Sequence, residues 1–281
     1  MLSPSWLLAP LNAVTHPLRR RLSRSGEVVL VDEDKTNLFR HLPAGERLDA
    51  EALEHALRER HRLRPLHERS TRSLYLDVLD HLVQLETVTA GVGPPRSGPL
   101  RVLEVGTGSW RTVFGFRRFL EGWGTTTPRD VELHGLEVDA SSPLPDLRTV
   151  GAHARARAEQ AGPSTCFHVG DGRRPPLAVT RRAPFDVVAL FFPFLTRRAL
   201  LAWGLPASFH GPEALLSRSI ELLARGGRLL VFNQTREERD LLHDGLEALG
   251  VEPQIVRPAV SRLLPWRERT EDRWATLARR R

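Results

Sequence analysis

The sequence has 281 residues, and its composition is that of an ordinary globular protein. Apolar residues make up 41% and charged residues 27%, which excludes wholesale disorder. The single cysteine, Cys166, cannot form an internal disulfide or a cysteine-rich zinc site. This excludes a disulfide-stapled secreted scaffold and favours a reducing cytoplasm.

The net charge of +7 comes from 41 Lys and Arg against 34 Asp and Glu. No segment gathers the basic residues into a block of the kind that binds nucleic acid, so no nucleic-acid partner is expected. No stretch approaches the roughly 20 apolar residues of a membrane helix, so no membrane span is expected. The N-terminal apolar residues precede the basic run 19–21, which reverses the order of a secretory signal. We therefore expect a cytoplasmic protein, and the sequence leaves its oligomeric state open.

The first third of the chain predicts helices. One is expected over 49–62, with Asp49 as its N-cap, because apolar residues recur at four-residue spacing there. A second is expected over 67–87, where the apolar residues fall on one face and Ser70 or Thr71 can provide the cap.

A linker divides the chain into two predicted parts. Residues 91–99 are rich in glycine and proline, which marks a boundary. We expect residues 1–95 to form a helical N-terminal cap or arm, with a short strand at 28–31, and residues 96–281 to form the main domain. Helices in the first part would lie over the site at which a substrate binds.

After the linker, apolar strands alternate with helices. The strands are predicted at 100–105, 131–137, 165–169, 185–192 and 227–232, and the helices at about 109–122, 147–161, 212–224 and 236–249. Alternation of this kind predicts an α/β fold with a doubly wound, mostly parallel sheet covered on both faces. Ligands of such sheets bind at the carboxyl ends of the strands, where the strand order reverses.

The first of these strands ends in a glycine turn. Gly106 and Gly108 allow a tight turn and a close approach of the backbone to a ligand. A dinucleotide fingerprint needs a third glycine at position 111, which is Arg111 here. Glu104 precedes the turn by two residues, and a carboxylate there suits a cationic amino-acid ligand better than a pyrophosphate.

Five further segments follow this motif in order. They are Gly135-Leu136-Glu137-Val138-Asp139, Gly170-Asp171-Gly172, Phe185-Asp186-Val187-Val188, Leu223-Ala224-Arg225-Gly226-Gly227-Arg228-Leu229 and Arg273-Trp274-Ala275-Thr276-Leu277-Ala278. With the Glu104-x-Gly106-x-Gly108 motif, the series resembles the class I S-adenosylmethionine-dependent methyltransferases over about residues 100–281. The resemblance implies a Rossmann-like sheet of seven strands, the last of them antiparallel.

The resemblance also implies S-adenosylmethionine as the cofactor and assigns residues to it. Glu104, Gly106 and Gly108 match the first motif of the family. Glu137 matches the acid that the family places on the two ribose hydroxyls, a task that suits a carboxylate because it accepts two hydrogen bonds. Asp171, followed by Gly172, matches the Asp that contacts the adenine amino group.

Two segments depart from the family pattern. Trp110 replaces the usual third glycine of the first motif, so we expect its indole either to border the cofactor or to fill its site. The fourth strand ends in residues 191–194, Phe-Phe-Pro-Phe, where members that methylate base or amide nitrogens carry Asn or Asp, then Pro-Pro-Tyr. The missing polar residue argues against methylation of an exocyclic base amine. An apolar wall suits an aromatic or lipid-like acceptor, and equally a packed strand end.

Methyl transfer requires the protein mainly to position the acceptor and at times to remove a proton. Asn233 follows the fifth strand and is a candidate to face the acceptor. His210 lies in the loop before a predicted helix and is a candidate base, because histidine titrates near neutral pH. A surface or capping role is the competing interpretation of this histidine. Cys166, inside the third strand, is expected to be a small buried apolar group. No metal site is expected.

The leading hypothesis is an enzyme that transfers a methyl group from S-adenosylmethionine to a small-molecule acceptor, with the methylated atom left open among O, N and C. One alternative is an RNA or protein methyltransferase, which the absence of a basic block disfavours. Another is a non-catalytic binding module with a methyltransferase fold, for which Trp110 is the best support. A nicotinamide dehydrogenase is disfavoured because Arg111 breaks the glycine pattern.

Overall fold

The computed structural model describes residues 5–22, 27–260, 263–264 and 273–281. Its helices are α1 (Ser5–Arg19), α2 (Ala44–Arg60), α3 (Arg64–Glu68), α4 (Arg72–Thr89), α5 (Val113–Gly122), α6 (Val150–Ala161), α7 (Leu177–Thr180), α8 (Arg197–Ala202), α9 (Pro212–Leu222) and α10 (Arg236–Ala248), with short 3-10 turns at Arg20–Leu22 and Ala207–Phe209. Its strands are β1 (Leu100–Val105), β2 (Val131–Glu137), β3 (Thr165–Val169), β4 (Phe185–Phe191), β5 (Leu223–Asn233), β6 (Pro253–Pro258) and β7 (Trp274–Arg279).

The seven strands form one sheet in the order β3-β2-β1-β4-β5-β7-β6. Strands β1 to β5 are parallel, whereas β7 lies antiparallel between β5 and β6. The strand order reverses between β1 and β4, where ligands bind in open α/β sheets. The predicted fold class, a doubly wound and mostly parallel seven-stranded sheet, is confirmed, and it is the fold of the class I methyltransferases.

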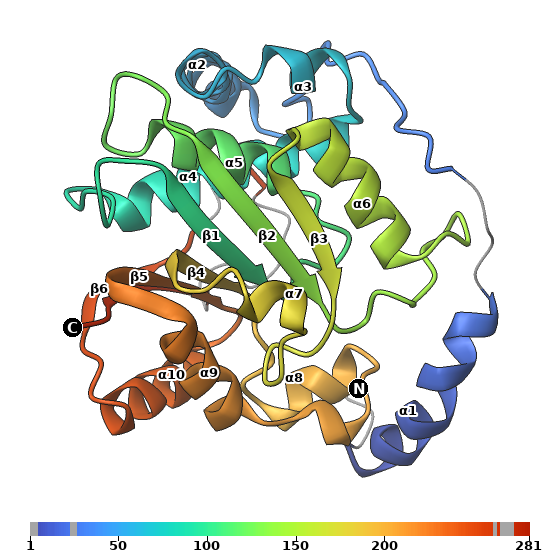
Figure 1. The fold of residues 1–281 in the computed structure, drawn as a ribbon. Helices are drawn as coiled ribbons and strands as arrows, with labels where there is room; N and C mark the ends of the chain where they lie inside the picture. Colours follow the sequence, from blue (N-terminus) through green and yellow to red (C-terminus); the bar gives the residue numbers. More distant parts are fainter. Residues whose placement is uncertain (1–4, 23–26, 261–262, 265–272) are drawn as a thin grey trace.

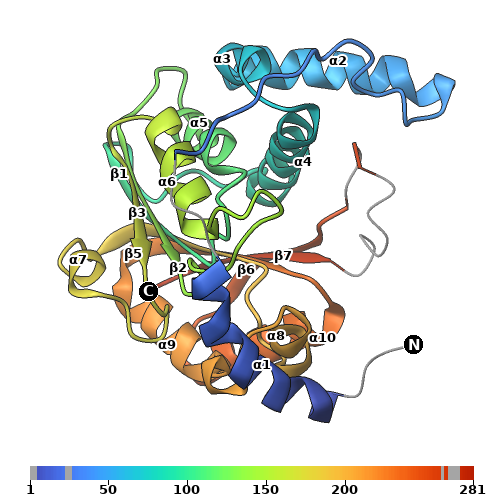
Figure 2. The ribbon, with the colours of Figure 1, turned by 90° about the vertical axis from the view of Figure 1, so that its right-hand side faces the viewer.

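Helices cover both faces of the sheet (Figures 1 and 2). One face carries α4, α5 and α6, and the other carries α9 and α10. Apolar side chains of β4 alternate between the two cores: Val187 and Ala189 belong to the first, and Val188 and Leu190 to the second. This two-sided burial explains why β4 is apolar throughout, as strands covered on both faces are.

Most predicted elements are close to the observed ones, and the differences have local causes. The bounds of β1, β2 and β3 are those predicted. The helix expected from 49 begins at Ala44, so Asp49 lies within α2 and is not its N-cap. Thr71 does cap α4, where its side chain accepts a hydrogen bond from the Leu74 amide. No strand forms at 28–31, whose residues pair with no neighbouring strand.

The N-terminal region is distributed over two parts of the molecule. Helix α1 packs against α8, and the Asn12 side chain donates hydrogen bonds to the carbonyls of Leu201 and Leu205. Helices α2 and α3 lie outside α4 (Figure 2). Helix α4 packs against α5 and β7, and the buried core is continuous from its side chains into α5. Of the described residues before 96, only those of α4 reach the cavity described below.

Candidate active site

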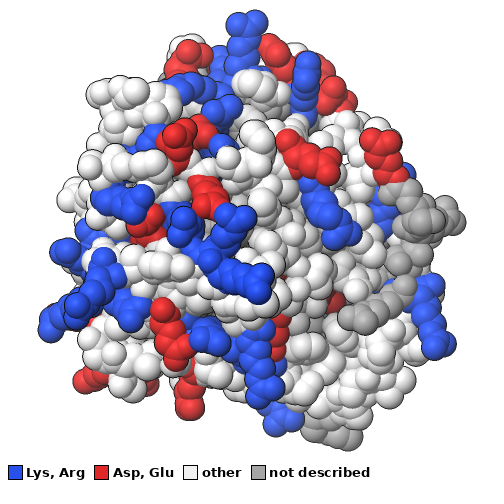
Figure 3. All heavy atoms as spheres, viewed as in Figure 1, with Lys and Arg blue, Asp and Glu red and all other residues white. Residues whose placement is uncertain are grey.

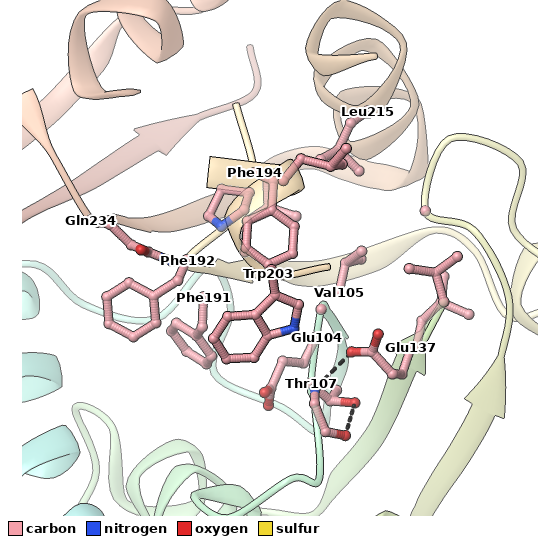
Figure 4. A pocket seen from close by; sticks show the side chains of 18 of the residues that line it. Glu104, Val105, Thr107, Glu137, Phe191, Phe192, Phe194, Trp203, Leu215 and Gln234 are labelled. Carbon is pink, nitrogen blue, oxygen red and sulfur yellow. Dashed lines mark hydrogen bonds between the residues drawn. The ribbon is translucent and has the colours of Figure 1, made fainter. Parts of the chain in front are cut away.

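A cavity of about 550 Å³ lies at the carboxyl ends of β1, β2 and β4. Its volume is in the range of small-molecule sites, about 300–1,000 Å³. The glycine turn, the loop at 170–173 and helix α4 complete its walls. Figure 4 shows Glu137 at one end of the view and Phe191 and Phe192 at the other, with Glu104 between them. The three predicted acids, Glu104, Glu137 and Asp171, and the apolar segment 191–194 therefore line one cavity.

The turn after β1 brings the backbone to the edge of the cavity. Gly106 and Gly108 have φ angles of +80° and +53°, in the region that glycine adopts most readily. The Gly106 amide donates to the Leu136 carbonyl at 2.8 Å, which ties the turn to β2. A Cβ atom built on Gly108 would meet nothing within 4 Å, so this side of the turn faces open space. Helix α5 begins at Val113, later than predicted, and residues 109–112 extend the turn.

Glu104 is buried at the end of β1, with 1% of its surface exposed. Its Oε2 accepts a hydrogen bond from the Trp110 indole Nε1 at 2.8 Å. Burial raises the pKa of Glu104 to about 8, and the nearby Glu137 carboxyl adds to the rise. The side chain is therefore mostly protonated at neutral pH, and a cation beside it would favour its charged form.

Trp110 lies behind the turn and not in the wall of the cavity. Its side chain has no exposed surface, and its ring packs against Gly135 of β2, where a Cβ atom would come within 2.6 Å of two ring carbons. Residue 110 has a φ of +56°, which turns the indole under the glycine turn. This placement corrects the expectation that the indole borders or fills the ligand site: its contact with the site is the hydrogen bond to Glu104. Gly135, a glycine inside a strand, is the feature of the sequence that indicates a large group packed against the strand at this point.

Glu137 ends β2 and fixes the loops on both sides of it. One oxygen accepts from the Gly108 amide and the other from the Asp139 amide, each at 2.7 Å. Burial is the largest influence on the pKa of Glu137 and raises it, while these amide bonds oppose the rise. The carboxylate lines the cavity, and a carboxylate has about four lone-pair positions, so it can still accept from a ligand hydroxyl.

Asp171 and Gly172 lie in the loop after β3, on the same cavity. Asp171 is held by Arg173, whose Nη2 lies 2.6 Å from Oδ2 and whose backbone amide lies 2.9 Å from Oδ1. A Cβ atom at Gly172 would lie 2.6 Å from Val105 and 2.8 Å from Leu215, so only glycine fits there without movement. A ligand amine at Asp171 would share the carboxylate with Arg173.

The segment after β4 forms the apolar side of the cavity. Phe191, Phe192, Pro193 and Phe194 all line it, together with Trp203 from the turn after α8 (Figure 4). Phe192 has a φ of +55°, which is uncommon for an aromatic residue and occurs mainly at functional or strained positions. Its amide is anchored to the Phe232 carbonyl of β5 at 2.8 Å.

Helix α4 supplies a polar side that the sequence analysis did not identify. Asp77, Asp80, His81 and Gln84 line the cavity. They recur at intervals of three and four residues in a helix that is otherwise mainly apolar and buried. That polar stripe is visible in the sequence and is the signal that could have identified this wall. Asp77 is paired with Arg111, a further cavity residue that faces it from the extended turn.

The two residues proposed for catalysis lie outside the cavity lining. His210 is half-buried behind it, with Nε2 3.2 Å from the Leu195 carbonyl oxygen. Asn233 is fully buried, and neither atom of its amide has a hydrogen-bond partner among the residues that the structure describes. The next residue, Gln234, is the one that reaches the cavity. Cys166 is exposed and not buried as expected, because β3 is the edge strand of the sheet.

Among the described residues, no group of three or more His, Cys, Asp or Glu side chains is arranged to hold a metal ion. Within the same residues, no helix has the length and apolar character needed to cross a membrane. Figure 3 shows acidic side chains among the arginines over the face that it displays. That face therefore carries mixed charge.

This chain resembles known proteins in its structure but matches none of them in its sequence. No protein-family model matches the chain, and no curated protein sequence matches it. Similar solved structures include the glycopeptide N-methyltransferase MtfA complexed with S-adenosyl-L-methionine, with 17% identity, 72% of this chain and 93% of that chain covered, and a TM-score of 0.46. The [4+2]-cyclase SpnF has 15% identity, coverage of 73% and 81%, and a TM-score of 0.48.

A third similar structure is the magnesium protoporphyrin IX methyltransferase ChlM from Synechocystis PCC 6803 with bound SAH, with 12% identity, 75% and 85% coverage and a TM-score of 0.45. At these scores and identities the likeness carries no argument about cofactor or activity. The fold assignment rests on the strand order and direction given above.

Proposed function

We propose that this protein binds S-adenosylmethionine and transfers its methyl group to a small-molecule acceptor. The observation that carries the proposal is the convergence of Glu104, Glu137 and Asp171 on one cavity, from the ends of three neighbouring strands. Three acids around a glycine turn suit a ligand that carries an ammonium group, a ribose diol and an adenine amine. A dinucleotide site would carry a third glycine at position 111, which is Arg here.

Each residue has a task in this proposal. Glu104 faces the ammonium group of the ligand, and Gly106 and Gly108 let the backbone approach it. Glu137 accepts hydrogen bonds from the ribose hydroxyls, since its oxygens keep lone pairs beyond those used by the backbone amides. Asp171 accepts from the adenine amine. Bound S-adenosylmethionine would supply an activated methyl group on a sulfonium.

The acceptor would bind between helix α4 and the apolar segment 191–194. These two walls face the same cavity as the acids, and the apolar one contains no Asn or Asp at its start. This composition favours a small molecule over an exposed base amine. In this proposal α4 is the part of the N-terminal region 1–95 that acts as a cap over the acceptor, and residues 96–281 form the cofactor-binding domain.

The alternatives receive less support from the geometry. A non-catalytic module was favoured by an indole that fills the site, whereas the cavity is open and Trp110 does not line it. An RNA methyltransferase needs clustered basic residues for its acceptor, and no segment of the sequence gathers them into a block. The single cysteine supports a reducing compartment such as the cytoplasm.

Titration calorimetry with S-adenosylhomocysteine tests the proposal through Glu137→Gln. The variant keeps the size of the side chain and removes its charge, so affinity should fall by about 10- to 150-fold, the range for hydrogen bonds to a charged group. Glu132→Gln is the matched control, because Glu132 lies at the other end of β2 and outside the cavity lining. Equal affinity of wild type and a folded Glu137→Gln variant would remove Glu137 from the site.

A further inference from the structure

We propose that the α4 side of the cavity is a binding subsite for an aromatic hydroxyl compound, whose hydroxyl donates a hydrogen bond to the imidazole of His81. The aromatic ring of the ligand would lie against Phe191 and Phe192. This inference rests on the proposed function, for which it names the class of acceptor. It assigns His81 a part in binding, and its test measures binding.

His81 stands where α4 meets the apolar wall. Its side chain is 8% exposed and lines the cavity. The imidazole makes an edge-to-face contact with Phe191 at 4.6 Å between ring centroids, and further aromatic contacts with Phe116 at 6.0 Å and Phe232 at 5.9 Å. The ring is therefore held by aromatic side chains on several sides, and its orientation is fixed before a ligand arrives.

The polar atoms of this imidazole are not satisfied by the protein. Nε2 is buried and has no hydrogen-bond partner among the described residues. A buried polar atom without a partner is costly, and in native proteins it needs a reason such as an absent ligand. Burial also lowers the pKa of His81 to about 3, so the ring is neutral at physiological pH. A neutral imidazole keeps one lone pair that can accept a hydrogen bond.

The two carboxylates nearest to His81 on α4 already have hydrogen-bond partners. On its own helix, Asp77 forms an ion pair with Arg111, and Asp80 accepts from the Gln84 amide at 2.9 Å. A ligand ammonium would have to leave water for a site next to a neutral imidazole and three phenylalanines, which is unfavourable. A ligand carboxylate would have to leave water for the same apolar surroundings, beside the carboxylates of Asp77 and Asp80. A neutral hydroxyl fits both the lone pair and the dry surroundings.

The apolar side of the cavity suits a ligand with an aromatic ring. Phe191 and Phe192 line the cavity beside His81, and the guanidinium of Arg273 lies over the Phe192 ring at 5.0 Å. Trp203 lines the cavity with 62% of its surface exposed, which is high for a tryptophan. A flat aromatic ligand can pack against these rings in the offset or edge-to-face geometry that aromatic pairs prefer.

The test compares two probes that differ by one donor. 2-Naphthol carries the hydroxyl, whereas 2-methoxynaphthalene has the same rings without a donor. Calorimetry on the full chain should show that wild type binds 2-naphthol about fivefold or more tightly than 2-methoxynaphthalene, the ratio that one ordinary hydrogen bond provides. In His81→Phe the ratio should fall to about one, and His81→Gln, which keeps an acceptor, should retain part of it.

Controls separate this inference from loss of structure. His67→Phe is the matched variant, because His67 packs on Tyr75 outside the cavity lining and its loss should leave the ratio unchanged. Nitrogen NMR of the wild-type histidines gives a second measurement: 2-naphthol should shift the His81 ring signal, and 2-methoxynaphthalene should not. The inference is overturned if 2-naphthol does not bind, if both probes bind equally, or if the ratio persists in folded His81→Phe.

A parallel titration with S-adenosylhomocysteine tests the cofactor assignment separately from the acceptor subsite. Binding of S-adenosylhomocysteine without discrimination between the naphthalene probes would refute the acceptor subsite alone. Discrimination between the probes without binding of S-adenosylhomocysteine would refute the cofactor assignment and leave the aromatic hydroxyl site in place.

Discussion

Replacement of Glu104 by glutamine should make the folded protein more stable at neutral pH. The pKa of Glu104 is about 8 in the folded chain and 4.5 in an ordinary glutamate. Below pH 4.5 the side chain is protonated in both states, so folding is unaffected. Between pH 4.5 and 8 the unfolded chain loses this proton while the folded chain keeps it, and stability falls as pH rises.

The size of the effect follows from the same two values. Each pH unit above 4.5 removes about 1.36 kcal/mol, so by pH 7 the free energy of unfolding is lower by about 3 kcal/mol. The glutamine side chain of the variant cannot ionise, and its oxygen can still accept from the Trp110 indole. Glu104→Gln should therefore exceed wild type in stability by up to about 3 kcal/mol at pH 7. At pH 5 the difference should be below about 1 kcal/mol.

Urea denaturation of both proteins at several pH values from 5 to 8 measures this difference directly. Glu132→Gln provides a control of opposite sign. Burial, the largest single influence, raises the pKa of that partly exposed carboxyl, but the hydrogen bonds and charges of Arg101 and His134 together lower it below its ordinary value. The stability of Glu132→Gln should therefore decrease relative to wild type above the ordinary pKa of glutamate. Parallel pH profiles for wild type and Glu104→Gln would refute the claim that Glu104 is held protonated.

Two further predictions concern Asp171, in the loop at 170–173, and Gly135, which packs against Trp110 under the glycine turn. In calorimetry, Asp171→Ala should weaken the binding of S-adenosylhomocysteine but hardly change the affinity for an analogue that lacks the adenine amine. Equal losses of affinity for both ligands would mean that Asp171 is only a turn residue held by Arg173. Gly135→Ala places a methyl group within 2.6 Å of the Trp110 ring and should lower the free energy of unfolding, measured in urea, by about 1–3 kcal/mol. Gly45→Ala is the control, because nothing lies within 4 Å of its added methyl group and its stability should not fall. A Gly135→Ala variant as stable as wild type would contradict the packing of the indole under the turn.

The sheet could be predicted from the sequence because its strands are apolar runs closed by turn residues. The bounds of β1, β2 and β3 agree with the prediction to the residue. Strand β6 could not be predicted, since it begins and ends with proline and its residues alternate between half-buried and exposed. Such a strand is tolerated at the edge of a sheet, where one side needs no hydrogen-bond partners.

The meeting of the three acids at one cavity could be predicted from the sequence. Glu104, Glu137 and Asp171 stand at strand ends that a parallel sheet brings to one edge. The position of Trp110 was not predictable, because it depends on a left-handed backbone conformation and on the space left by Gly135. The polar side chains of α4 reach the cavity because of how that helix packs against the sheet, which spacing along the helix alone does not determine.

The central claim is that the cavity at the carboxyl ends of β1, β2 and β4 binds S-adenosylmethionine. Calorimetric titration of the wild-type chain with S-adenosylmethionine, S-adenosylhomocysteine and, for comparison, NAD tests it most directly. We predict one molecule of each sulfur ligand per chain, bound well below millimolar concentration. NAD should not bind, because Arg111 stands where a dinucleotide site has its third glycine. Failure of the folded protein to bind either sulfur ligand at millimolar concentration would contradict the account.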